Sequence, residues 1–202
     1  MDEQQLIIKA KEGDLQAFNH LVLTYQEVVY NCSYRILSDP AGACDITQDT
    51  FITAYQKIDK FKNGSFKAWL LRVATNKCLD EIRRQKRHPN TALEPLTNDD
   101  QETFDSPYWL TDDTPLPEEQ LSQSELNQAV QDCLARLPED FRSIVVMVDM
   151  QEMNYSETAQ IIGIPLGTIK SRLARARKRL QDCLQRFSEL LPSQFRFNQE
   201  EQ

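Results

Sequence analysis

The sequence predicts an all-α protein made of two small helical domains joined by a flexible acidic linker. Apolar residues recur at three- and four-residue steps in segments between Phe18 and Ile82 and again after residue 124, as they do along the buried side of a helix. The stretch between these segments is rich in acids and prolines and lacks the helical period. The run Ile144–Val148 has strand propensity, but it lies between two expected helices with no partner strand, which favours helix.

Charge divides the chain into the same segments. The 202 residues carry a formal net charge of −8. Residues 88–135 contain 11 acidic and no basic side chains, whereas residues 1–87 and 136–202 have net charges of +2 and +1. The acidic balance therefore belongs to the middle of the chain, and it does not exclude nucleic acid as a partner of the two ends.

The first domain, expected over residues 1–88, has an early helix that Asp14 can cap. Apolar side chains from Phe18 to Ile36 follow the helical period, and the pair Asp39-Pro40 ends this helix. A second helix is expected over Asp45–Lys57. Both helices are amphipathic, so we expect them to pack on each other.

A polar connector over Asp59–Ser65 leads into a long helix over Phe66–Arg87. This long helix carries seven basic side chains and only two acidic ones, Asp80 and Glu81. Such a surface is suited to phosphate groups. The alternative is an ordinary solvated face.

The predicted linker covers residues 89–123, and its prolines and acids make a packed core there unexpected. It is either a plain tether or a segment that docks through its apolar side chains. The sequence assigns no specific role to its aromatics Tyr108 and Trp109.

The second domain is expected over residues 124–187, with a tail over 188–202. Its first helix has a regular apolar face from Leu126 to Leu137. Pro138 lies near the start of a second helix over Glu139–Met150.

Residues 155–180 are typical of a helix, a tight turn and a second helix. Asn154 or Ser156 can cap the first of these helices, and Gly163 permits the turn. The second helix is strongly basic, with no acid from Pro165 to Leu180. A cationic helix on a small apolar anchor suits the major groove of DNA, whereas the alternative is an amphipathic helix that closes a three-helix core. The anchor residues are Ile162, Ile164, Ile169 and Leu173.

The five cysteines are far apart in the sequence, odd in number and without a CxxC pair. We therefore expect buried free thiols rather than a metal site or a disulfide framework. Redox sensing is possible but has no support in the sequence. The cysteines are Cys32, Cys44, Cys78, Cys133 and Cys183.

The sequence does not indicate an enzyme. It has no nucleophile–base set, no metal-ligand spacing and no phosphate-binding loop, so no cofactor, metal or small-molecule substrate is expected. The first residues lack the pattern of a signal peptide, and no stretch approaches the roughly 18 apolar residues of a membrane span. We expect a cytoplasmic protein with no membrane partner.

Four segments, in order and at characteristic separations, resemble the extracytoplasmic-function (ECF) sigma factors of bacterial RNA polymerase. Helix-turn-helix patterns alone are common, but this ordered set is specific. The segments are Gly13–Tyr25 (GDLQAFNHLVLTY), Asp45–Tyr55 (DITQDTFITAY), Phe66–Arg87 (FKAWLLRVATNKCLDEIRRQKR) and Leu137–Leu180 (opening LPEDFRSIVVMVDM).

The resemblance implies a sigma region-two domain over residues 1–88 and a sigma region-four domain over 124–187. The implied function is that of a dissociable subunit that binds core polymerase, recognises promoters and promotes DNA opening, in a stress-response regulon under an anti-sigma factor. The implied partners are core polymerase, promoter DNA as duplex and as melted non-template strand, and the anti-sigma factor. The alternative is a stand-alone helix-turn-helix regulator that binds duplex DNA without polymerase; no heptad seam for dimerisation supports it.

The resemblance also implies a role for the helix over Asp45–Lys57 in gripping a coiled coil of the polymerase. Acids and an amide can pair with arginines there, and an aromatic can anchor the patch. For Phe51 the alternative is a place in the core. The implied core-binding residues are Asp45, Gln48, Asp49 and Phe51.

The connector and the long helix match the part of the family that melts and reads the minus-ten promoter element. Asn63 allows the loop to close around an extruded base, and Asn76 matches a position that lines the pocket for a flipped base. Trp69 is expected either to stack on DNA or to lie in the core, with the core favoured. The implied minus-ten residues are Lys60, Lys62, Asn63, Lys67, Trp69, Arg72, Asn76, Lys77, Arg83 and Arg84.

The basic helix near the C-terminus matches the family's recognition helix for the minus-thirty-five element. Lys170, Ser171 and Arg175 are expected at base edges, with Thr168 near the helix start and Arg177 nearer phosphates. The implied minus-thirty-five residues are Thr168, Lys170, Ser171, Arg172, Arg175, Arg177 and Lys178.

Overall fold

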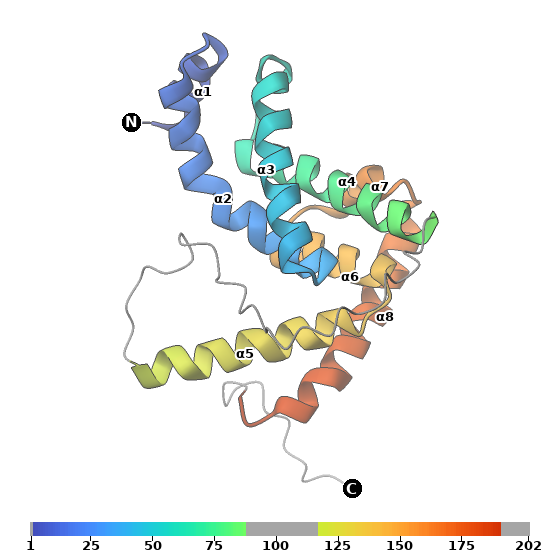
Figure 1. Cartoon of the computed structure of the whole chain (residues 1–202). Coiled ribbons are helices and arrows are strands. Elements are labelled where there is room, and N and C mark those ends of the chain that lie inside the picture. Colours follow the sequence, from blue (N-terminus) through green and yellow to red (C-terminus); the bar gives the residue numbers. More distant parts are fainter. Residues whose placement is uncertain (1, 88–116, 191–202) are drawn as a thin grey trace, which may run out of the picture. The chain divides into compact units, whose positions relative to one another are not determined.

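The computed structural model describes residues 2–87 and 117–190 (Figure 1). The chain divides into two compact units, the first with the helices before the predicted linker and the second with those after it. In the described ranges helices are the regular secondary structure and strands are absent, as predicted. Residues 89–116 of the predicted linker and 191–202 of the predicted tail lie outside the described residues, so the expectations for them stay predictions, whereas residues 117–123 are helical.

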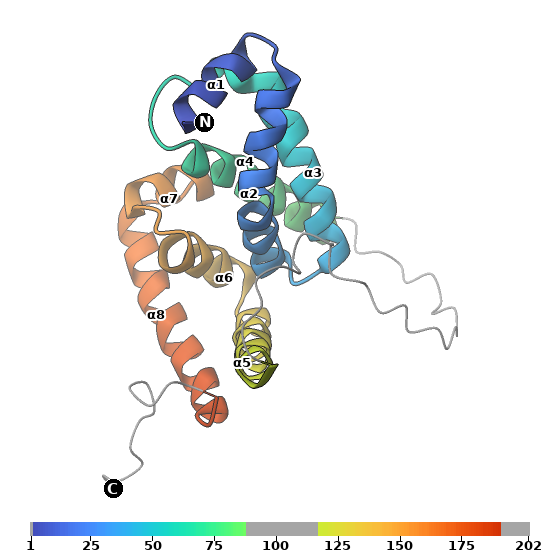
Figure 2. The ribbon, with the colours of Figure 1, turned by 90° about the vertical axis from the view of Figure 1, so that its left-hand side faces the viewer.

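The first unit is built around α2, which packs against three other helices, α1, α3 and α4 (Figures 1 and 2). A short 3-10 helix, η1, follows α3 directly and leads into the connector. The elements are α1 (Glu3–Lys11), α2 (Leu15–Leu37), α3 (Pro40–Lys57), η1 (Ile58–Lys60) and α4 (Phe66–Arg87).

Capping side chains determine where α2 and α3 begin. The carboxylate of Asp14 accepts hydrogen bonds from the backbone amides of Gln16 and Ala17 at 2.8 and 3.1 Å, as predicted. Asp39 caps α3 in the same way, and Pro40 occupies its first turn. The helix therefore starts at Pro40 rather than at Asp45, because the first turn of a helix does not need the amide that proline lacks.

The core of the first unit contains an apolar cluster that includes the completely buried Phe66. The ring of Phe61 meets Phe66 edge to face at 5.4 Å, and Trp69 lies 5.5 Å from each of these two rings. Phe61 lies within the connector, directly after η1, and Phe66 is the first residue of α4, so burial of both rings fixes the two ends of the exposed segment 62–65.

The helix α1 was not predicted from the sequence. Its side chains Leu6, Ile7 and Ala10 join the same core. Two polar contacts tie it to the rest of the unit: the Lys11 ammonium donates to the Phe61 carbonyl, and the Tyr25 hydroxyl donates to the Glu3 carboxylate at 2.9 Å.

The second unit packs α5, α6 and α7 against α8. The segment expected as one helix over Glu139–Met150 is an α-helix followed by a π-helical turn, and its centre is buried helix, as predicted, rather than strand. The elements are α5 (Pro117–Ala135), α6 (Glu139–Val145), η3 (Val146–Met150), α7 (Tyr155–Ile162), α8 (Leu166–Leu184) and η4 (Gln185–Phe187).

Helix boundaries in the second unit refine the sequence-based expectations. The helix α5 begins at Pro117, inside the predicted linker, rather than near Ser124. Of the two candidate caps for α7, Asn154 is the one used: its side chain accepts from the Glu157 amide at 2.8 Å. Gly163 ends α7 with a φ of 77°, a left-handed conformation that favours glycine.

We expect Tyr25 to report the contact between α1 and α2 through its titration. Burial, the hydrogen bond to Glu3 and the negative charge of that carboxylate raise the pKa of Tyr25 from 10.0 to about 12. The folded state thus holds this proton more tightly than the unfolded chain, so the contribution to stability is complete below pH 10 and is lost as the pH rises toward 12. In a titration followed by tyrosinate absorbance, Tyr25→Phe should remove a late component. Burial raises the pKa of Tyr30 as well, so part of the late absorbance remains in Tyr25→Phe. A late component of unchanged size in Tyr25→Phe, or a smaller one in the control Tyr55→Phe, would contradict the contact.

Candidate nucleic-acid and partner interfaces

The exposed side of α3 presents the predicted polar patch. Asp45, Gln48 and Asp49 are all exposed, and their spacing of three and four residues puts them on one side of the helix. Such a row of acids and an amide can receive arginine side chains from a partner helix.

The aromatic residue predicted to anchor this patch is in the core instead. Phe51 is 8% exposed and belongs to the apolar cluster of the first unit, on the stripe that α3 buries. Ile52, the next residue, is 55% exposed and continues the row of Asp45 and Asp49. The apolar member of the exposed patch is therefore Ile52, because one residue turns the side chain by about 100° around a helix axis.

The connector presents Lys60, Lys62 and Asn63 to solvent. Gly64 has a φ of 106°, a value that strains any other residue, so the sharp turn at this point requires glycine. The Ser65 hydroxyl accepts from the Ala68 amide at 3.2 Å and caps α4. The connector is thus a short exposed loop held between a buried phenylalanine and a capped helix.

The basic side chains of α4 differ in how far they are engaged within the protein. Lys67 and Asn76 are exposed, whereas Arg72 is half-buried. Arg83 and Arg84 form ion pairs with acids one turn earlier on α4: Asp80 at 2.9 Å and Glu81 at 2.7 Å. Exposed ion pairs contribute little free energy to stability, so both guanidinium groups can exchange their carboxylate partners for phosphates.

Two predicted residues of α4 also contact neighbouring elements. The Lys77 ammonium lies 3.3 Å from the Asp49 carboxylate, which links the predicted DNA side of α4 to the predicted polymerase side of α3. Trp69 is partly buried against the core, which agrees with the favoured expectation for this side chain.

The helix α8 presents its basic residues from an apolar stripe formed by Ile169, Leu173 and Ala176, all of them buried. Lys170, Ser171 and Arg175 are exposed, and Lys170 and Arg175 have no ion-pair partner within the described ranges. No side chain caps the start of α8, so its first amides remain available to an anion. Thr168 is half-buried in that first turn, and its carbonyl accepts from the Ser171 hydroxyl at 3.1 Å.

Two of the predicted contact residues also pair with acids on neighbouring elements. Arg172 donates to Asp140 of α6 at 2.9 Å. Arg177 forms a two-pronged pair with Asp149 of η3, with its Nε 3.0 Å from Oδ2, and these hydrogen bonds raise the pKa of Arg177. Asp140 and Asp149 are distant from α8 in the sequence. The spacing of basic residues therefore could not distinguish Arg172 and Arg177 from Lys170 and Arg175. Lys178 lies 3.9 Å from Asp182 on its own helix.

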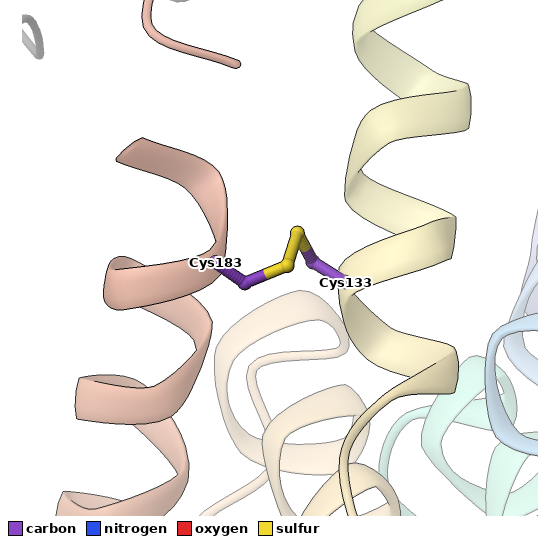
Figure 3. Close-up of a disulfide and its surroundings, with 2 residues drawn as sticks. All are labelled: Cys133 and Cys183. Carbon is purple, nitrogen blue, oxygen red and sulfur yellow. A yellow bond between two sulfur atoms is a disulfide. The ribbon is translucent and has the colours of Figure 1, made fainter. Parts of the chain in front are cut away.

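A disulfide between Cys133 and Cys183 joins α5 to the last turn of α8 (Figure 3). The expectation of free thiols is therefore wrong for this pair. Fifty residues separate the two cysteines in the sequence, and only the packing of α5 on α8 brings their Cα atoms to 5.7 Å. The bridge closes a loop that contains α6, α7 and nearly all of α8.

The other three cysteines are free, as predicted. Burial raises the pKa of Cys32 to about 12, and burial also raises the pKa of Cys78. Both thiols therefore stay protonated and unreactive near neutral pH. Cys44 is partly exposed, and burial together with the nearby acids raises its pKa as well.

Among residues 2–87 and 117–190, no group of three or more His, Cys, Asp or Glu side chains could hold a metal ion. No helix in the same ranges has the length and apolar character needed to cross a bilayer.

Comparison with known families gives two matches along the chain. Residues 21–88 match Sigma-70 region 2, and residues 127–180 match Sigma-70 region 4. The first range contains α4 and the connector, and the second contains α7 and most of α8. The helix α1 precedes both.

Curated relatives match the chain over nearly its full length. The ECF RNA polymerase sigma factor SigW of Bacillus subtilis is 34% identical over 179 residues, which are 88% of this chain and 94% of that protein. The ECF RNA polymerase sigma-E factor of Haemophilus influenzae is also 34% identical, over 92% of this chain and 96% of its own.

Solved structures show the same fold. The sigma factor RpoE of Bartonella quintana, in complex with the anti-sigma factor NepR, has a TM-score of 0.58 at 26% identity, over 84% of this chain and 98% of its own. CnrH, in complex with the cytosolic domain of CnrY, has a TM-score of 0.57 at 21% identity, over 90% and 96% of the two chains.

We expect reduction of the Cys133–Cys183 bridge to destabilise the second unit and leave the first unchanged. Closing a loop of 50 residues restricts the unfolded chain by about 4 kcal/mol in the chain-entropy account. Chemical denaturation with and without a phosphine reductant, followed unit by unit by hydrogen exchange, would measure the difference. Cys133→Ser should remove the sensitivity to reductant, and Cys44→Ser is the matched control that should keep it. Equal stability of the second unit in both redox states would contradict the prediction.

Proposed function

Because the chain belongs to the extracytoplasmic-function family of RNA polymerase sigma factors, we propose that it binds bacterial core polymerase as a dissociable specificity subunit. In that role it directs the enzyme to promoters with particular minus-ten and minus-thirty-five elements and promotes opening of the DNA. The proposal depends on one observation: both sigma regions occur in one chain, region 2 before region 4, and the similarity to SigW covers 88% of that chain.

Core binding is assigned to the exposed row on α3. Asp45, Gln48 and Asp49 would pair with basic side chains of a polymerase helix, and Ile52 would supply the apolar contact at the centre of the patch. Phe51 supports this surface from beneath, since it is buried in the core.

Reading of the minus-ten element is assigned to the connector and to the start of α4. Lys60, Lys62 and Lys67 would hold phosphates of the melted strand, while the amides of Asn63 and Asn76 would address base edges. Arg83, Arg84 and Lys77 would add phosphate contacts by exchanging their ion pairs. Arg72 and Trp69, both partly buried, would act at the edge of this surface.

Reading of the minus-thirty-five element is assigned to the first half of α8. Lys170, Ser171 and Arg175 face solvent and are the residues proposed at base edges, with the uncapped first turn and Thr168 at a phosphate. Arg172 and Arg177 hold the helix in place through Asp140 and Asp149.

The family consists of transcription initiation factors rather than enzymes in their own right. We infer that the chain itself is not catalytic and that it works in the cytoplasm, where bacterial polymerase works. An anti-sigma protein is the proposed regulator, in a stress-response regulon. The structure of the RpoE relative was solved with an anti-sigma factor, and that relative supports this assignment. The stand-alone regulator is the less favoured function, because it leaves the region-two match unexplained.

Reconstitution with bacterial core polymerase tests the proposal directly. Transcription from a promoter library should give initiation from a selected subset that core alone does not use, and the enriched sequences should share two elements. Tight binding of the isolated chain to duplex DNA, with no core association and no initiation, would support the stand-alone regulator instead.

A comparison of Arg175→Ala with Arg177→Ala tests the assignment on α8. The two changes remove the same side chain from the same helix, but only Arg175 is proposed to touch DNA directly. For the reconstituted enzyme, Arg175→Ala should weaken duplex binding about ten-fold and lower the slope of log affinity against log salt by about one, with an unchanged melting temperature. Arg177→Ala should lower the melting temperature slightly and affect binding less. Equal losses of affinity in both variants would refute the distinction.

A further inference from the structure

The connector that is proposed to read the minus-ten element is exposed at its tip and anchored at both ends. Residues 62–65 are exposed, while Phe61 before them is 7% exposed and Phe66 after them is completely buried. The two rings meet at 5.4 Å, so the ends of the loop are held close together. A loop that must fit one base needs such anchors, because unrestrained backbone would lose entropy on binding.

The first anchor is held by α1 through Lys11. The Lys11 ammonium donates to the Phe61 carbonyl at 2.5 Å and lies 5.7 Å from the centre of the Phe61 ring. One cation therefore restrains both the backbone and the side chain of Phe61, the residue before the exposed segment 62–65. Lys11 is only partly exposed, which limits its use as a phosphate contact.

The second anchor is held by the other end of α1. The Glu3 carboxylate accepts from the Tyr25 hydroxyl at 2.9 Å, and the Tyr25 ring lies 5.8 Å from that of Phe66. Between these two polar contacts, the buried side chains Leu6, Ile7 and Ala10 share one apolar cluster with Phe61 and Phe66. Both ends of the connector are thus tied to the same short helix.

We propose that α1 is a clamp for the minus-ten connector, with Lys11 and Glu3 as positioning residues that set the shape of the loop without touching DNA. This inference rests on the proposed role of the connector in reading the melted strand. The helix lies before residues 21–88, the range that matches Sigma-70 region 2. The amino-terminal segment therefore contributes to promoter discrimination from outside that range.

The test uses holoenzyme reconstituted from the full chain and core polymerase. Its probe is a fork-junction promoter, taken from the library selection, with the non-template strand single-stranded across the minus-ten element. A second probe carries one substituted base in that element. Lys11→Met should weaken binding of the first probe about ten-fold and reduce discrimination between the two probes, because a charged hydrogen bond and a ring contact are lost. Affinity for core polymerase and for minus-thirty-five duplex should not change.

Two variants control for charge and for chemistry. Lys9→Met removes the same charge from the same helix, at an exposed position, and should keep full discrimination. Lys11→Arg retains a cation with hydrogen-bond donors and should keep most of the discrimination between the two probes. Where Lys11→Met proves too unstable to assay, Glu3→Gln tests the other end of the clamp with a smaller change.

Asn63→Ala separates failure of the clamp from failure of the proposed function. If Asn63→Ala reduces discrimination, the double variant Lys11→Met/Asn63→Ala should be no worse than the poorer single variant, since Lys11 acts through the loop. Full discrimination in Lys11→Met together with a defect in Asn63→Ala would overturn the clamp alone. Full discrimination in Asn63→Ala would overturn the reading role of the connector, and the clamp with it. Equal losses of discrimination in Lys9→Met and Lys11→Met would show that α1 acts only through its overall charge, and would also overturn the clamp.

Discussion

Burial of one stripe of α8 against its neighbours is the interaction on which the second unit depends. Ile169, Leu173 and Ala176 are removed from water where α8 meets α5, α6 and α7, and this burial leaves Lys170 and Arg175 outside. Arg172 and Arg177 add ion pairs to Asp140 and Asp149 on neighbouring elements. In the proposed role of α8 as a recognition helix, a surface held in this way needs less ordering on binding to DNA.

The same constraint organises the first unit. The buried stripe of α3 includes Ile46 and Phe51, which leaves the acids and Ile52 exposed for a protein partner. The pair Lys77–Asp49 connects this side to α4, so the surfaces proposed for polymerase and for DNA share a contact. The connector between them is short and exposed, and its shape depends on two buried phenylalanines and, in our proposal, on α1.

The disulfide adds a covalent restraint to the second unit. It joins the end of α8 to α5, whereas the residues proposed to contact DNA lie in the first half of α8. Reduction would therefore act mainly on stability and only indirectly on the DNA surface. In a reducing cytoplasm, where disulfides are rare, the packing of α5, α6 and α7 on α8 would have to hold the unit without the bridge.

The sequence by itself determined the helical class, the two-part organisation and the family. Periodicity, capping residues and breakers act over a few residues, so they are readable along the chain: Asp14, the limits of α4 and the turn at Gly163 all agree with the structure. It also identified the basic surface of α8, because charge within one helix needs no tertiary information.

Only the tertiary structure decided which side chain on each helix is free to act. Sequence patterns could not choose between Phe51 and Ile52 as the exposed apolar residue, since both fit an amphipathic helix. They could not separate Arg175 from Arg177, because Asp149 lies 28 residues away from its partner. The pairing of Cys133 with Cys183 and the contact of Lys11 with Phe61 join residues 50 positions apart, and only packing brings such positions together.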